Sequence, residues 1–250
     1  MRVTAAIGTA LLLGALLACK SSSSSSGPAA SASAASDEAV DDSPVGSFGK
    51  ITDAEVEARA KAAGFKILKT ESDTDGGGVS LLALELEDAK HYAYVNLYDL
   101  APPRTNKGLH AAKMGSTGGI AIELDDEYHK PDADKLLSDL VAKQPVDGAT
   151  RAKLKAALES LGWDVESASS ETEDGLTVNS VTGTNDDGGI SVTHIDLSAA
   201  LKDKRAAIDG TKLMNVFVCK DCTKRKVNAF SEAWQRAKAG RLLRKIAKSD

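Results

Sequence analysis

Apolar residues recur with two periods along the chain, and each period predicts a kind of element. Val56 and Ala60 lie four residues apart, as on one face of a helix. Thr52 begins a capping-box pattern and Gly64 is a typical C-terminal cap, so we predict a short helix over 53–63. The runs that follow it, FKILKT, VSLLALELE and HYAYVNLYDL, have the apolar character and alternation of strands.

The same order of patterns occurs a second time. Thr52 and Gly64 match Thr150 and Gly162 at an offset of 98 residues, and VNLYDL aligns with VTHIDL further along. The segment HAAKMGSTGGIAIELDD then aligns with RAAIDGTKLMNVFVCKD at an offset of 95, as small loop deletions would produce. The preserved order indicates an internal duplication.

Each copy is predicted to contain a helix, a three-stranded meander, a helical connection, a last strand and a closing helix. The connections are expected at 104–114 and 199–208, and the closing helices at 132–143 and about 225–247. The predicted fold class is therefore α+β. We expect two tandem homologous modules, 49–145 and 148–247, each an antiparallel four-stranded sheet with helices on one face.

The N-terminal pattern differs from the rest. A basic start precedes the apolar run AAIGTALLLGALLA, which is typical of a signal peptide and too short to span a bilayer as a mature helix. Its end, Leu16-Leu17-Ala18-Cys19, resembles the lipobox of bacterial lipoproteins. The resemblance implies cleavage of residues 1–18, diacylation of the Cys19 thiol and, because Lys20 follows, sorting to the outer membrane. An ordinary secretory leader with an accidental cysteine is the alternative.

Residues 19–48 are mostly Ser, Ala, Gly, Pro and Asp. Such a segment cannot bury enough apolar surface to offset the entropy of ordering, so we expect a disordered tether. A flexible chain of this length has a root-mean-square reach of about 30 Å. The tether would lift a folded body off the bilayer surface.

Composition and charge narrow the possible partners. The chain of 250 residues has 42% hydrophobic and 27% charged residues, but only 4% aromatic ones, which disfavours a stacking platform for single-stranded nucleic acid. Positive charge is concentrated at the end, where 220–250 contains 10 basic and 3 acidic residues. An acidic body with a basic end is not typical of a nucleic-acid-binding protein.

The residues with catalytic potential are dispersed. Four histidines, His91, His110, His129 and His194, occur without a GxSxG or HExxH motif, and we expect them to be structural or exposed. The glycine-rich GSTGGI, DTDGGG and NDDGG segments lack the features of phosphate or calcium loops and are expected to be turns. We therefore predict a protein that is not an enzyme and that needs neither cofactor nor metal.

Tyr92, Tyr94 and Tyr98 alternate within one predicted strand and should share a face. They could pack beneath the helices of the module. Alternatively, they could form an amphipathic aromatic surface for a glycan or a protein partner. The second copy lacks the aromatic residues at the first two positions, so the module itself does not require them.

Cys219 and Cys222 stand between a predicted strand and the closing helix. A CxxC pair at a helix start superficially resembles the thioredoxin active site, but no proline follows Pro145 to supply that family's cis-proline loop. We expect a local disulfide in an oxidising envelope, and keep a periplasmic thiol-disulfide redox protein as the alternative function.

The closing helix is basic. Its apolar face, which includes Trp234 and Ala237, is expected to pack on the module, and docking of its cations on anionic headgroups is the alternative. The sequence as a whole predicts a lipid-anchored protein of the outer membrane, facing the periplasm or the surface, that serves as a non-catalytic binding or structural component.

Overall fold

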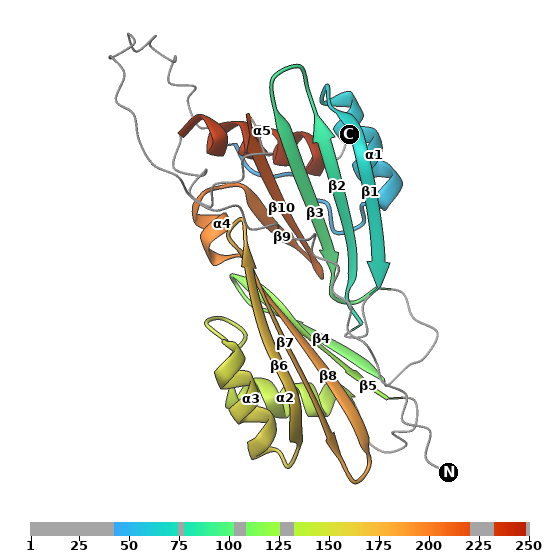
Figure 1. Cartoon of the computed structure of the whole chain (residues 1–250), viewed down its shortest axis with the longest axis vertical. Helices are drawn as coiled ribbons and strands as arrows, with labels where there is room; N and C mark the ends of the chain where they lie inside the picture. The colour runs from blue at the N-terminus through green and yellow to red at the C-terminus, as the bar shows by residue number, and fades with distance from the viewer. Residues whose placement is uncertain (1–42, 75–77, 103–108, 126–132, 221–232, 249–250) are drawn as a thin grey trace, which may run out of the picture.

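A computed structural model describes residues 43–74, 78–102, 109–125, 133–220 and 233–248, which form two antiparallel five-stranded sheets (Figure 1). The first half of the chain contains α1 (Asp53–Ala62), β1 (Lys66–Thr74), β2 (Ser80–Glu87), β3 (Tyr92–Asp99), β4 (His110–Met114), β5 (Gly118–Leu124) and α2 (Ala133–Lys143). The second half contains α3 (Arg151–Ser160), β6 (Asp164–Glu173), β7 (Leu176–Asn185), β8 (Gly188–Asp196), α4 (Ser198–Lys202), β9 (Ala206–Asp209), β10 (Lys212–Cys219) and α5 (Ala233–Ala247).

The two halves exchange their last hairpins. The first sheet has the order β1-β2-β3-β10-β9, and the second sheet has the order β4-β5-β8-β7-β6. Each three-stranded meander therefore pairs with the hairpin of the other half of the chain. Helices α1 and α5 cover one face of the first sheet, and α2 and α3 cover one face of the second.

Equivalent backbone details support the duplication. The β1–β2 pairing shifts register between Ile67 and Lys69, and the β6–β7 pairing shifts between Val165 and Ser167, which are the same positions at an offset of 98. Gly64 and Gly162 end the first helices of the two halves with φ of 93° and 87°, a left-handed conformation that favours glycine. The two halves thus share their bulge and their helix cap.

The predicted α+β class agrees with this mixture of sheets and helices, but two separate four-stranded modules are not confirmed. Each sheet has five strands and draws on both 49–145 and 148–247. The connection predicted as a helix over 104–114 contains strand β4, while the one predicted over 199–208 overlaps both α4 and strand β9. Alanine-rich segments such as HAAKM carry little strand signal and favour helix locally, so tertiary pairing overrides the local preference.

The folded body also begins earlier than predicted. Phe48 is buried, Val45 packs against the first core, and Gly46 lies so close to the backbone of Ala247 that a Cβ there would meet its carbonyl oxygen at 2.8 Å. The carbonyl of Ser43 accepts a hydrogen bond of 2.7 Å from Nε of Arg244. The chain therefore enters the body beside the C-terminal end of α5, and not at residue 49.

Three apolar clusters stabilise the molecule. One lies between the first sheet and its helices, and one lies between the second sheet and its helices. The third joins the two sheets and includes Leu100 and Leu197, the equivalent residues at which the chain leaves β3 and β8. Leu100 N donates to Thr211 O at 3.0 Å, and Leu197 N donates to Thr117 O at 2.8 Å. The points at which the chain leaves β3 and β8 are thus held by equivalent hydrogen bonds.

In each sheet, one carboxylate connects the exchanged hairpin to the segment that precedes a helix, which is α3 for the β4–β5 hairpin and α1 for the β9–β10 hairpin. Asp147 accepts hydrogen bonds from the backbone and hydroxyl groups of Ser116 and Thr117 in the β4–β5 turn. These bonds, led by the one from the Ser116 hydroxyl, hold the pKa of Asp147 at about 2. Asp209, the last residue of β9, accepts hydrogen bonds from the Ser47 hydroxyl and from the backbone N–H groups of residues 48 and 49, and these bonds, led by the one from Ser47, lower its pKa. The carboxylate thus belongs to the segment before the helix in one case and to the hairpin in the other.

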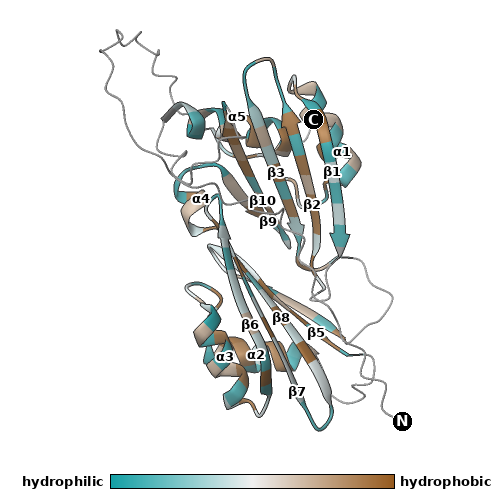
Figure 2. Cartoon of the chain, in the orientation of Figure 1, coloured by the Kyte–Doolittle hydropathy of each residue, from teal (hydrophilic) through white to brown (hydrophobic). Residues whose placement is uncertain are grey.

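The edges of the sheets are protected from pairing with other chains. The long edge strands β1 and β6 are mainly hydrophilic (Figure 2), and most of their residues are exposed. At the opposite edges, β4 and β9 have only five and four residues. Polar or short edge strands are a common means of avoiding edge-to-edge association.

Candidate functional site

The turn between β2 and β3 is organised by one carboxylate. Asp88 Oδ1 accepts hydrogen bonds from the backbone N–H groups of Lys90 and His91, both at 2.8 Å, and lies 2.9 Å from His91 Nδ1. Its Oδ2 accepts a hydrogen bond of 2.8 Å from Nζ of Lys238 on α5. Partial burial opposes ionisation, but these hydrogen bonds outweigh it and hold the pKa of Asp88 well below its usual value.

A groove of about 660 Å³ lies between this turn and α5. We call it the α5 groove, and it is lined by Ala63, Phe65, Asp88, Lys90, His91, Lys220, Trp234, Lys238, Arg241, Leu242 and Lys245. Five of these residues are cations and Asp88 is the one carboxylate among the described lining residues. Figure 1 shows that the β2–β3 turn and α5 lie at the end of the first sheet remote from the second sheet.

Helix α5 supplies its share of the groove from one stripe. Trp234, Lys238, Arg241 and Lys245 follow the i, i+4, i+7, i+11 spacing that places side chains on one face of a helix. The opposite stripe contains Leu243 and Ala247, which are buried in the first core. The amphipathic pattern of α5 therefore turns Lys238, Arg241 and Lys245 into the groove.

Aromatic rings lie among these cations. The ring centroids of His91 and Trp234 are 5.5 Å apart, and Nζ of Lys220 lies 4.8 Å from the centroid of the Trp234 ring. Nζ of Lys238 lies 6.0 Å from the centroid of the Phe65 ring. These cation–π contacts hold the ammonium groups in place beside the rings. The groove thus combines fixed positive charge with apolar ring surface, which is suited to an anionic ligand that has an apolar part.

The second sheet provides an internal comparison. Its β7–β8 turn repeats the same hydrogen bonds, because Asn185 Oδ1 accepts from the backbone N–H groups of Asp187 and Gly188 at 2.9 and 3.1 Å. Asp187 stands where Lys90 stands in the first sheet, so the charge is inverted on an unchanged turn. Helix α2 carries both acidic and basic residues, whereas α5 has no acidic residue. The turn therefore does not require the positive charge of Lys90.

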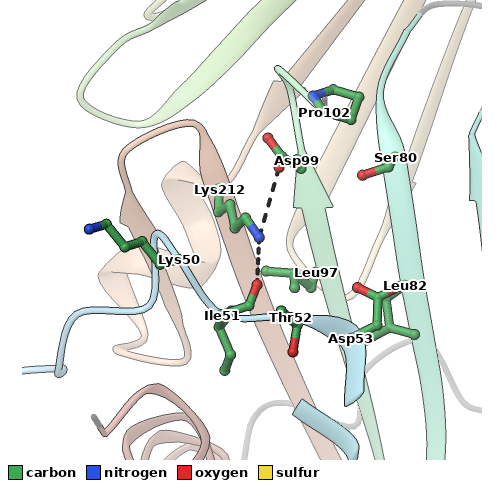
Figure 3. Close-up of a pocket in the computed structure, with 10 residues that line it drawn as sticks. All are labelled: Lys50, Ile51, Thr52, Asp53, Ser80, Leu82, Leu97, Asp99, Pro102 and Lys212. Atoms are coloured by element: carbon green, nitrogen blue, oxygen red, sulfur yellow. Dashed lines mark hydrogen bonds and ion pairs between the residues drawn. The ribbon is translucent and has the colours of Figure 1, made fainter. Parts of the chain in front are cut away.

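A smaller crevice of about 270 Å³ lies near the start of α1 (Figure 3). Lys212 donates a hydrogen bond of 2.6 Å to the carbonyl of Ile51 and lies 3.8 Å from Asp99. Asp99 also accepts hydrogen bonds from Thr211 and from the backbone of Ala101. Lys212 and Asp99 thus connect the segment before the first helix to the exchanged hairpin, which indicates a structural role for this pair.

The three predicted tyrosines share the face of β3 opposite the helices, since the alternating Ala93, Val95 and Leu97 face the first core. They therefore do not pack beneath α1 and α5. Each tyrosine is half-buried: Tyr98 packs against the cluster that joins the sheets, and the rings of Tyr94 and Phe217 are 6.1 Å apart. A binding face at Tyr92, Tyr94 and Tyr98 stays a prediction.

Cys219 ends β10, is 4% exposed and is disulfide-bonded. Its predicted partner Cys222, like the predicted lipidation site Cys19, lies outside the described residues, so this pairing stays a prediction. A redox-active thiolate must be reachable by its partner. The burial of Cys219 is more typical of a structural bridge than of such a thiol.

The histidines lie far apart in the structure. His194 is buried between Asn179 and the carbonyl of Val146, whereas His91 lines the α5 groove, and His129 lies outside the described residues. The described part of the chain contains no group of three or more His, Cys, Asp or Glu side chains placed to hold a metal ion. Within the same part, no helix has the length and apolar character needed to cross a bilayer.

No family model, curated protein or solved structure matches this chain. The α5 groove was not predicted from the sequence. Its signal was the spacing of Trp234, Lys238, Arg241 and Lys245, which marks a cationic stripe on the closing helix. What the sequence did not show is that the β2–β3 turn of the other half of the chain faces this stripe.

Proposed function

We propose that the protein is a lipid-anchored, non-catalytic binding component of a bacterial outer membrane, and that it binds an anionic partner in the α5 groove. The observation that carries this proposal is the inversion of charge between Lys90 and Asp187 on two equivalent turns. The β7–β8 turn forms with Asp187 at the position of Lys90, so the turn does not require a cation there, and the positive charge of the groove is suited to binding a ligand.

The anchor rests on the resemblance of Leu16-Leu17-Ala18-Cys19 to a lipobox. If Cys19 carries the lipid, Cys19→Ala expressed in a bacterium should lose labelling by a fatty-acid probe, and the chain should leave the membrane fraction. Equal labelling of the variant and the parent chain would contradict the anchor. Without acyl chains the protein loses its hydrophobic attachment to the bilayer, so the loss should be nearly complete from membranes washed with high salt, which also weakens electrostatic contacts.

The binding proposal can be tested with the fluorescence of Trp234. The chain has only two tryptophans, and Trp163 is buried in the second core at the position equivalent to Phe65. Trp163→Phe therefore leaves one indole, in the α5 groove. Titration of this variant with inorganic pyrophosphate should change its fluorescence saturably, because a multivalent anion would bind beside the Lys220–Trp234 contact.

The matched variants change charge equally at two places. Lys90→Glu with Lys245→Glu alters exposed groove residues, whereas Lys113→Glu with Lys143→Glu alters exposed residues on β4 and α2. The first pair should weaken pyrophosphate binding at least tenfold, and the second pair should leave it nearly unchanged. Equal binding by both double variants would contradict the groove as the binding site.

A further inference from the structure

The α5 groove and the start of the tether lie at the same helix. Arg244 holds the carbonyl of Ser43, where the described chain begins, and the groove residues Arg241 and Lys245 lie within one turn of Arg244. If residues 19–42 form the predicted tether, they would reach about 27 Å on average. Any surface that holds the lipid of Cys19 is therefore within reach of the groove.

Resting on the proposed function, we infer that the anionic partner is the phosphate headgroup of the lipids in the anchoring membrane. The groove would then be a second and reversible attachment to the bilayer that holds Cys19. Tethering converts this second contact into an intramolecular event at high effective concentration, so a weak headgroup site suffices to dock the body.

The chemistry of the groove fits this ligand. Lys90, Lys220 and Lys245 are exposed, and none of them forms an ion pair with a carboxylate among the described residues. An anionic surface attracts such cations, while Trp234 has the amphipathic ring that is enriched at membrane interfaces. Asp88 engages Lys238 and thereby keeps that ammonium group fixed at the floor of the site.

The test uses the unlipidated chain from Lys20 to Asp250, which contains every described residue, with Trp163→Phe. It should sediment with vesicles of phosphatidylcholine and phosphatidylglycerol, but not with phosphatidylcholine alone, and salt should release it. Each lysine near an anionic surface strengthens binding about fivefold. Lys90→Glu with Lys245→Glu should therefore weaken vesicle binding at least about 25-fold, and Lys113→Glu with Lys143→Glu should change it little.

Other outcomes would overturn the inference in distinguishable ways. Pyrophosphate binding at Trp234 without vesicle binding would leave the proposed function standing and exclude the headgroup as its ligand. Vesicle binding that is equal in the two double variants would place the membrane contact outside the groove. Stronger binding to polygalacturonate than to phosphatidylglycerol vesicles, lost in the groove variant, would identify an acidic glycan as the partner.

Discussion

At the scale of single residues, one buried pair shows how the two halves solve the same packing problem differently. Asn179 and His194 are cross-strand partners in the second sheet, and Leu82 and Leu97 are partners at the equivalent place in the first. All four are nearly inaccessible. His194 Nε2 donates to the Val146 carbonyl at 3.0 Å, while its Nδ1 accepts from Asn179 at 3.1 Å, an arrangement that requires a neutral ring.

Burial lowers the pKa of His194 below its usual value of about 6.5. Below about pH 6.5 the unfolded chain binds the proton more readily, so the free energy of unfolding should fall as pH drops, by at most about 1.4 kcal/mol per pH unit. This contribution is complete above the pKa of the unfolded chain. Urea unfolding at about pH 7.5 and 5.5 measures it.

The Leu82–Leu97 pair of the first sheet suggests variants that test this pH dependence. Asn179→Leu with His194→Leu copies the leucine pair and should remove this pH dependence. His194→Leu alone should also remove it, but should cost about 1–3 kcal/mol more because the Asn179 amide is left buried without its partner. An identical change in stability between the two pH values in the parent chain and the double variant would contradict the assignment to His194.

At the scale of elements, the junction between the sheets depends on a turn and a buried cation. Arg205 is 2% exposed, and its guanidinium donates to the Asp174 carbonyl in the β6–β7 turn and, at 3.2 Å, to Asn215 of β10. Asp174 and Gly175 both have positive φ, as in the tightest hairpins. A Cβ on Gly175 would meet the guanidinium, so this Asp-Gly turn fits against the first sheet only with glycine.

The exchanged hairpins make a further prediction about the two halves. The segment between α2 and α3 contains no strand, so the chain can be divided there, before Gly148. Each half would then lack the hairpin that completes its meander. Residues 43–147 and 148–250 should therefore reassemble into a 1:1 complex with the spectrum of the intact protein when they are mixed. Two separate monomers that each unfold cooperatively, with no complex by size-exclusion chromatography, would contradict the exchange.

The elements themselves were largely predictable, but their partners were not. The predicted helix at 53–63 and closing helix at 132–143 nearly coincide with α1 and α2, because caps and apolar spacing are local signals. Strand β3 pairs with β10 and not with β5, although both are apolar strands from equivalent positions. Pairing within a copy and exchange between copies bury similar surfaces, so hydrophobic pattern does not distinguish them.

At the scale of the whole molecule, the likeness of the two halves separates what the fold requires from what the proposed binding requires. Features present in both halves, such as the strand bulge and the clamped hairpin turns, serve the fold. Features present in one half, such as the cations of the α5 groove, are additions to it. The groove is also composite, since its β2–β3 turn comes from the first half of the chain and α5 from the second. A local reading of either half could not have found it.

Because of the exchanged hairpins, the sheet whose strands are synthesised first is not the sheet that is completed first. All strands of the second sheet have been made once the ribosome passes Asp196, because β4 and β5 precede β6, β7 and β8. The first sheet begins earlier but must wait for β10 and α5, near the end of the chain. The oldest strands of the nascent protein are thus the last to be covered, and until then β3 presents an open edge. Any chain that stops short of β10 would carry one complete sheet beside one exposed and aggregation-prone edge.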